Sequence, residues 1–95
     1  MKIRVIKTRT MRKRLLDIGF EEEAGRDHIF YFYRYGRKIV VRTKMSHGAD
    51  EIRQPILGLI GKQLQLERGE FENLLRGELL QQDYEAILRT KGIIT

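Results

Sequence analysis

One stretch of the sequence, residues 25–48, concentrates the strand-forming residues: Gly25-Arg26-Asp27-His28-Ile29-Phe30-Tyr31-Phe32-Tyr33-Arg34-Tyr35-Gly36-Arg37-Lys38-Ile39-Val40-Val41-Arg42-Thr43-Lys44-Met45-Ser46-His47-Gly48. It is rich in β-branched and aromatic residues, and a glycine interrupts it near the middle, at Gly36. This pattern predicts two strands joined by a tight turn. The only two histidines of the chain, His28 and His47, stand near the two ends. A turn at Gly36 would bring both to the open end of the hairpin.

The first strand of this hairpin has two chemically different faces, because successive side chains point to opposite sides of a strand. One face carries the phenylalanines, with His28, Phe30, Phe32 and Arg34. The other carries the tyrosines, with Ile29, Tyr31, Tyr33 and Tyr35. We expect the phenylalanine face to be buried against helices and the tyrosines to stay half exposed. There the tyrosines would cover the sheet or stack on nucleic-acid bases.

The residues before the hairpin predict a helix and an edge strand. Residues 1–7 alternate charged and apolar side chains, which fits a short strand or a disordered basic arm. Met11, Leu15 and Ile18 then form one apolar helical stripe that ends at Gly19. Residues 20–24 predict a poor strand, since the glutamates at 21–23 are weak strand formers that an edge position tolerates.

The residues after the hairpin are predominantly helical in pattern. Residues 50–66 carry a strong apolar stripe, and the regular helix is expected to start at Gln54 or Pro55 after a turn at residues 50–52. We expect Gly58 and Gly61 to allow close packing on the sheet. Residues 67–95 predict short amphipathic helices that pack on the domain through Phe71, Leu74, Tyr84 and Leu88. The predicted fold class is α+β, a double-stranded-RNA-binding-domain-like α-β-β-β-α unit over residues 1–66 with a helical extension over residues 67–95.

Composition narrows the possible functions. The 95-residue chain predicts one small domain, and it contains no cysteine, which excludes disulfides and thiolate metal sites. No apolar run approaches the roughly 20 residues of a membrane span, so we expect a cytoplasmic protein without a membrane partner. Residues 1–48 hold 13 basic and 5 acidic residues, a net charge of +8, whereas residues 49–95 hold 6 and 8, a net charge of −2. A basic first half indicates a nucleic-acid partner, unless it is only a solvated surface with an excess of lysine and arginine.

Several segments of the sequence resemble motifs of a known protein family. Gly25-Arg26-Asp27-His28 resembles the Gly-Ser-x-His motif of HicA-type toxins, although arginine stands at the usual serine position. Residues 38–48 are similar to the third strand and histidine-containing exit loop of that family. Asp50-Glu51-Ile52 and Pro55, followed by Ile60, Lys62, Gln63, Leu64 and Leu66, resemble its last helix. The resemblance implies a dsRNA-binding-like fold, a metal-independent ribonuclease that cleaves messenger RNA, and inhibition by a HicB-type antitoxin. It places the catalytic histidine at His28.

RNA cleavage would make use of these residue types. The RNA supplies its own nucleophile, the 2′-hydroxyl, so the protein must supply a proton acceptor and cations. A histidine near its ordinary pKa of roughly 6.5 accepts a proton at cellular pH, and Arg26, Arg42 or Lys44 would stabilise the transition-state charge. Otherwise His28 merely hydrogen-bonds a loop, while His47 fits a loop role or phosphate binding near the next helix. No metal or other cofactor is expected, since two histidines without a carboxylate cluster are weak evidence for zinc.

Two function classes remain open from the sequence. One is a HicA-like ribonuclease, and the other is a non-catalytic RNA- or DNA-binding module with the same fold. A third possibility is a scaffold whose C-terminal helices bind other proteins. In the first two classes, nucleic acid would contact the basic residues and one histidine of the first half: Arg12, Arg26, Arg34, Arg37, Lys38, Arg42, Lys44 and His47.

Overall fold

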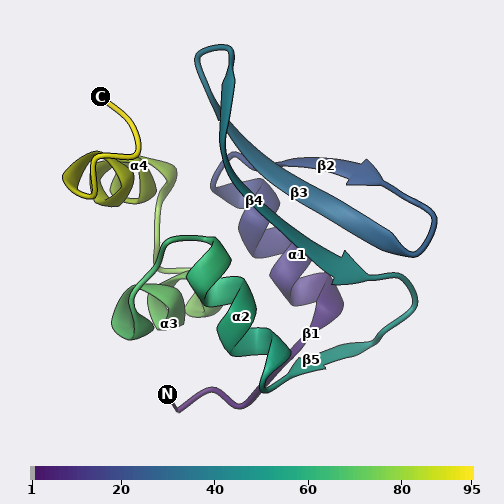
Figure 1. Cartoon of the computed structure of the whole chain (residues 1–95). Coiled ribbons are helices and arrows are strands. Elements are labelled where there is room, and N and C mark those ends of the chain that lie inside the picture. Colours follow the sequence, from purple (N-terminus) through teal and green to yellow (C-terminus); the bar gives the residue numbers. More distant parts are fainter. Residues whose placement is uncertain (1) are drawn as a thin grey trace.

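The hairpin forms as expected in the computed structural model, which describes residues 2–95. Strands β3 (His28–Tyr35) and β4 (Lys38–Ser46) pair antiparallel across a two-residue turn, where Gly36 adopts a positive φ of 64°. Next to the turn, Arg34 pairs with Ile39 but Tyr33 pairs with Val41, so Val40 is an extra, bulged residue. Strand β2 (Glu21–Ala24) pairs with β3 and is an edge of the three-stranded sheet, as predicted. The expected α+β class with an antiparallel three-stranded sheet is confirmed (Figure 1).

The expected burial of the sheet faces is wrong. Tyr31 and Tyr33 are each only 1% exposed, whereas Phe30 is 44% exposed. The tyrosines bury their rings and still satisfy their hydroxyl groups: Tyr31 donates a hydrogen bond to Glu22 at 2.6 Å and Tyr33 donates one to Glu85 at 2.5 Å. The tyrosine side is therefore the inner face of the sheet, and the phenylalanine side is its outer face.

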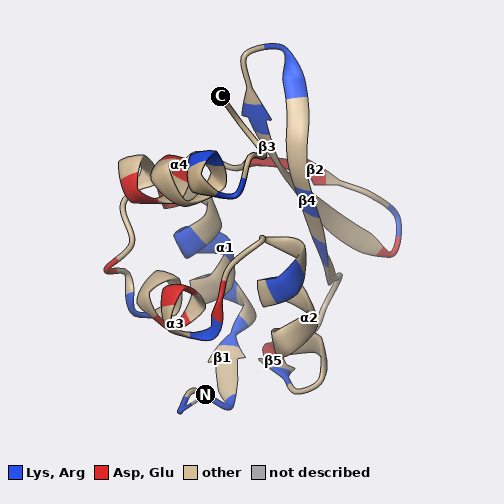
Figure 2. Ribbon diagram, turned by 60° about the vertical axis from the view of Figure 1, so that its left-hand side comes forward, with Lys and Arg blue, Asp and Glu red and all other residues tan. Residues whose placement is uncertain are grey.

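Helices cover only the inner face of this sheet. Helix α1 (Thr8–Asp17) buries Met11 and Leu15, and α2 (Ile56–Gln63) lies beside β4, where Thr43 donates to Gln63 at 2.7 Å. In Figure 2 the helices gather on one side of β2, β3 and β4, and the other side stays open. No helix among residues 2–95 is long and apolar enough to span a bilayer.

A second, small sheet changes the expected order of elements. Strand β1 (Val5–Lys7) pairs antiparallel with β5 (Glu51–Arg53), with Ile6 opposite Ile52. The N-terminal segment is therefore a strand over residues 5–7, the expected turn at residues 50–52 lies mostly in β5, and α2 starts only at Ile56. Met1 lies outside the described residues. The order over residues 2–95 is β-α-β-β-β-β-α-α-α, which differs from the expected α-β-β-β-α followed by helices.

The segment beyond residue 66 packs against the rest of the chain through helices α3 (Arg68–Arg76) and α4 (Gln81–Thr90). Phe71, Leu74, Tyr84 and Leu88 are 0–3% exposed and belong to the same buried cluster as the sheet. The Tyr84 ring stands edge-on to Tyr33, with centroids 5.3 Å apart, and its hydroxyl donates to the Leu64 carbonyl. A Cβ on Gly61 would lie 2.8 Å from the Phe71 ring, so Gly61 allows α2 to pack closely on α3. The expectation was that it would allow close packing on the sheet.

Candidate nucleic-acid interface

The outer face of the sheet combines the exposed Phe30 ring and the half-buried Phe32 ring with basic side chains from β4 and with Glu21 and Glu23 from β2. Phe30 and Phe32 of β3 lie opposite Lys44 and Arg42 of β4, and cross-strand partners share a face. The Arg34 guanidinium lies 5.6 Å from the centroid of the Phe32 ring. We call His28, Phe30, Phe32, Arg34, Arg42 and Lys44 the outer-face cluster.

A shallow depression of about 290 Å³ lies in this face. Phe30, Phe32 and Arg42 line it, together with Glu23 from the edge strand. An exposed ring beside unpaired cations is the arrangement that binds a nucleobase by stacking and the neighbouring phosphate by charge. Neither Arg42 nor Lys44 has an acidic partner within 4.0 Å among residues 2–95.

His28 stands at the open end of the hairpin, on the same face as Phe30. It is half-buried, and its ring centroid lies 6.3 Å from that of Phe30, tilted by 48°. Within residues 2–95 its imidazole has no hydrogen bond to another protein group, which leaves both ring nitrogens available to a ligand. Asp27 immediately precedes the strand and offers its backbone carbonyl to the His47 N–H at 3.0 Å.

Gly25 stabilises the turn between β2 and β3 that precedes His28. Its N–H donates to the His28 carbonyl at 2.8 Å and closes the turn between β2 and β3. A Cβ at this position would lie 2.7 Å from Phe30 Cε2 and 2.9 Å from the His28 carbonyl oxygen. Glycine is therefore required for the Phe30 ring to lie across the turn, next to His28.

His47 also lies at the open end, directly after Ser46, which pairs with His28. Strand β5 lies between His47 and α2 in the sequence, and among residues 2–95 the His47 side chain makes no hydrogen bond to the N-terminus of α2. His47 is exposed and available to solvent. The structure thus places the two histidine segments side by side but puts only His28 on a defined face of the sheet.

The remaining predicted contact residues lie in different places. Arg37 and Lys38 stand at the hairpin tip, where Figure 2 shows basic residues projecting from the body of the protein. Arg26 lies in the turn between β2 and β3, two residues before His28. Arg34 forms an ion pair with Glu21, with 3.1 Å between Nε and Oε2.

Arg12 does not join these residues. From α1 its guanidinium holds Glu22 with two hydrogen bonds, of 2.7 and 3.0 Å. Hydrogen bonds from Arg12 and from the Tyr31 hydroxyl group lower the pKa of Glu22. The contact with Glu22 raises the pKa of Arg12. Burial, and next the hydrogen bond to Glu22, raise the pKa of Tyr31. Arg12 thus neutralises a carboxylate at the edge of the inner face.

Phe30, which is exposed, and Phe32, which is half-buried, were not predicted as site residues. The available signal was the second strand, where apolar Val41 and Met45 alternate with basic Arg42 and Lys44. This alternation predicts that the basic residues face outward. It does not reveal which β3 residues lie opposite them, because that depends on the bulge at Val40.

Among residues 2–95, no three or more His, Asp or Glu side chains gather as a metal site would require. Comparisons with family models, with curated proteins and with solved structures find no match to this chain.

Proposed function

We propose that the protein binds single-stranded RNA across the outer-face cluster. The observation that carries this proposal is the 44% exposed Phe30, which lies opposite Lys44 and beside His28 on a sheet face that no helix covers. Phe30 lies between Glu23 of β2 and Lys44 of β4, and an exposed ring beside a cation can stack on a base while the cation contacts the neighbouring phosphate. Unpaired bases can stack on Phe30 and Phe32, while the lysine and arginine side chains contact phosphates.

RNA cleavage at His28 is the second part of the proposal. The imidazole makes no hydrogen bond to any of residues 2–95, and it lies on the same face as the aromatic rings and Lys44. A 2′-hydroxyl brought to this position by stacking would give its proton to His28 and attack the adjacent phosphorus. The bond from phosphorus to the 5′-oxygen would then break, and this leaving oxygen would take up a proton from water or from the imidazolium of His28. Lys44, which lies opposite Phe30, would stabilise the negative charge that develops on the phosphate, and Arg26, two residues before His28 in the turn, is a second candidate for this role.

The resemblance to HicA-type toxins supports the same assignment, since it places the catalytic histidine at His28. It also proposes a HicB-type antitoxin as partner and a dsRNA-binding-domain-like core formed by α1, β2, β3, β4 and α2. The alternative is a non-catalytic RNA- or DNA-binding module, which would use the same stacking surface without proton transfer.

The decisive experiment incubates the purified protein with labelled single-stranded RNA in EDTA. We expect cleavage that leaves a 2′,3′-cyclic phosphate, and His28→Ala should lose about 10²–10⁴-fold in rate while still binding RNA. His47→Ala is the matched histidine control and should cost less in rate. Tight binding without cleavage by the intact protein would favour the non-catalytic module.

Binding is tested separately with Phe30→Ala. Loss of one stacking contact is worth about 1–3 kcal/mol, so affinity for single-stranded RNA should fall roughly 5- to 150-fold. Leu59→Ala is the matched control, because Leu59 is 50% exposed but lies on α2, away from the outer face. Equal affinities for both variants and the intact protein would exclude the outer face as the binding surface.

A further inference from the structure

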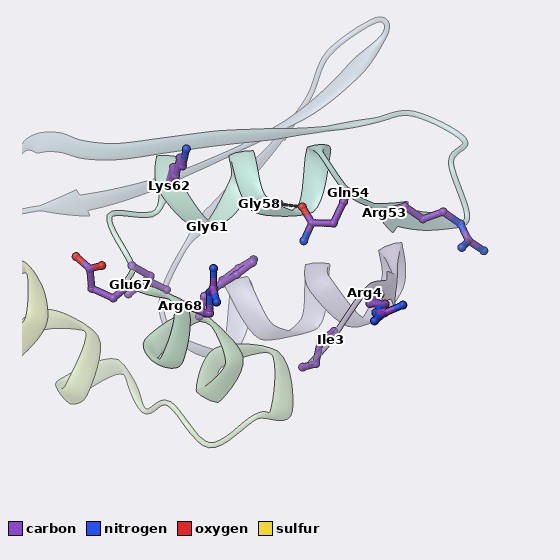
Figure 3. A pocket seen from close by; sticks show the side chains of 11 residues that line it. Ile3, Arg4, Arg53, Gln54, Gly58, Gly61, Lys62, Glu67 and Arg68 are labelled. Atoms are coloured by element: carbon purple, nitrogen blue, oxygen red, sulfur yellow. Dashed lines mark hydrogen bonds between the residues drawn. The ribbon is translucent and has the colours of Figure 1, made fainter. Parts of the chain in front are cut away.

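A second surface of the molecule is a groove of about 760 Å³ between the N-terminal segment, α2 and the start of α3 (Figure 3). None of its lining residues belongs to the outer-face cluster. Apolar residues line the floor: Leu66 and Phe71 are buried core residues, Ile3 packs against the same core, and Gly58 and Gly61 present no side chain. The floor along α2 is therefore mainly apolar, with the Gln54 side-chain amide over Gly58 and the Phe71 ring over Gly61.

Positive charge dominates the rim of the groove. Four of its residues are basic, Arg4, Arg53, Lys62 and Arg68. Arg53 is paired with Glu51 at 2.8 Å, but the other three have no acidic partner within 4.0 Å among residues 2–95. Among the lining residues within 2–95, one is acidic, Glu67. It takes part in the capping box of α3, its carboxylate lies 3.7 Å from Lys91 Nζ, and it points away from the groove in Figure 3.

The charges stand toward the two ends of the groove. Lys62 and Arg68 lie toward one end, Arg4 lies toward the other, and Ile3 and Gly58 lie between them; Arg53 is also at the Arg4 end, but its guanidinium points away from the groove (Figure 3). The two ends are separated by about the length of α2, which at ~1.5 Å per residue is roughly 12 Å for its 8 residues. A ligand that matches the groove thus carries negative charge at both ends and an apolar group in the middle.

We propose that this groove binds an extended acidic peptide segment of a partner protein. At ~3.3 Å per residue, acidic residues about four positions apart would reach both ends, with an apolar side chain between them on the floor. Nucleic acid fits the groove less well, because Phe71 is only 3% exposed and no aromatic face is open for base stacking. The outer-face cluster, by contrast, has the exposed Phe30 ring and suits RNA.

The test uses a fluorescently labelled peptide with acidic residues on both sides of a central leucine, and measures binding by anisotropy. The same peptide with amides in place of the carboxylates should bind at least ~10-fold more weakly, since charge-assisted hydrogen bonds are lost. Arg68→Glu and Arg4→Glu should weaken binding of the acidic peptide by a similar factor. Arg89→Glu, an exposed basic residue on α4 outside the groove, is the matched control and should leave binding within about twofold.

A steric variant separates the groove from general charge effects. A Cβ on Gly58 would approach only the flexible end of Gln54, so Gly58→Leu should fold and fill the floor of the groove. We expect it to abolish peptide binding and to leave single-stranded RNA binding unchanged. For the unmodified protein, amide chemical shifts on peptide titration should change around residues 3–4, 53–62 and 66–71.

Three results would overturn the proposal. The first is acidic-peptide affinity that stays the same in Arg68→Glu and Gly58→Leu. The second is a set of chemical-shift changes confined to β3 and β4. The third is a loss of RNA affinity, and not of peptide affinity, in the groove variants, which would assign the groove to nucleic acid.

Discussion

Glu22 is a junction between an edge strand, a helix and the inner face of the sheet. It accepts hydrogen bonds from Arg12 and from the Tyr31 hydroxyl group, and its pKa is lowered chiefly by Arg12. Because the folded protein prefers the ionised carboxylate, this stabilisation is present above the ordinary pKa of 4.5 and is lost as the pH falls through the lower folded value.

The first prediction tests this junction with Glu22→Gln. The amide can still accept a hydrogen bond from Tyr31 but carries no charge, so we expect the melting temperature to fall by roughly 4 °C at neutral pH. The difference from the intact protein should shrink below pH 4.5, as thermal melts across acidic pH would show. Glu23→Gln is the matched control on the same strand, and an equal, pH-independent loss in both variants would contradict the assignment.

The second prediction concerns Gly25. A methyl group there meets the Phe30 ring at 2.7 Å and a backbone carbonyl oxygen at 2.9 Å, and the backbone cannot yield as a flexible side chain does. Gly25→Ala should therefore destabilise the protein by about 1–3 kcal/mol in denaturant unfolding and weaken RNA binding by displacing Phe30. Gly69→Ala on α3, where nothing lies within 4 Å of the added methyl, should instead be neutral or stabilising by up to about 1 kcal/mol.

At the scale of elements, α4 is held to the hairpin through Tyr33. The Tyr33 hydroxyl group donates to Glu85 and accepts a hydrogen bond from Gln81 Nε2 at 3.0 Å, so both polar partners come from one helix. Burial and, next, Glu85 raise the pKa of Tyr33 from 10.0 to about 12. The hydroxyl form is thus part of the contact between α4 and β3.

The third prediction is that this contact weakens in strong alkali. Stability due to Tyr33 should be complete below pH 10 and fall as the pH rises through about 12, because the unfolded chain releases the proton earlier. Denaturant unfolding combined with the near-ultraviolet absorbance of tyrosinate measures both events. Tyr33→Phe should be less stable at neutral pH, since Glu85 loses its donor, and should lose part of the alkaline dependence. An unchanged alkaline profile in this variant would argue against the role of Tyr33.

At the scale of the whole molecule, one apolar core spans the chain from β1 to the C-terminal residues. The buried cluster joins Ile6 and Leu15 to Tyr33, Leu74 and Leu88. Arg14 on α1 also donates to the Leu75 carbonyl on α3 at 3.0 Å. Removing α3 and α4 would therefore expose apolar surface on the inner side of the sheet and leave polar groups unpaired.

The fourth prediction is that a chain ending at residue 66 does not fold on its own. Its circular dichroism should lack a cooperative thermal transition, because a remaining core of this size is too small to offset the loss of conformational entropy. A chain ending at residue 92 is the control and should fold, since it keeps α3 and α4 and loses only one buried residue, Ile94. Cooperative melting of residues 1–66 would instead support an autonomous N-terminal domain.

The fifth prediction concerns the salt dependence of RNA binding by the whole molecule. Lys44→Ala should reduce the slope of log affinity against log salt by about 0.7, the value for one lost phosphate contact to a single strand. Lys13→Ala is the matched control, because Lys13 is engaged by Asp17 at 3.0 Å on the other side of the sheet. Binding that does not respond to salt in any variant would exclude the phosphate contacts.

Local chemistry by itself determined most of the elements of this protein and some of their ends, but not strand β5, where a turn was expected. The apolar stripe of Met11, Leu15 and Ile18 forms a buried helical face, glycines stand at the α1 end and the hairpin turn, and Glu21–Ala24 is an edge strand. These features depend on neighbours within a few positions, so the sequence carries their signal directly. The positions of His28 and His47 at one end of the hairpin follow in the same way.

Only the tertiary structure decided which face of the sheet is buried, which strands pair at a distance and which basic residues stay unpaired. Without the bulge at Val40, a two-residue turn would place Phe30 opposite Thr43; with it, Phe30 lies opposite Lys44 and the faces are exchanged. The pairing of Ile6 with Ile52 and of Arg12 with Glu22 likewise depends on contacts between distant segments. Side chains that alternate along a strand define two faces of the sheet, but this alternation does not indicate which face is buried. The buried face is the one against which the helices pack.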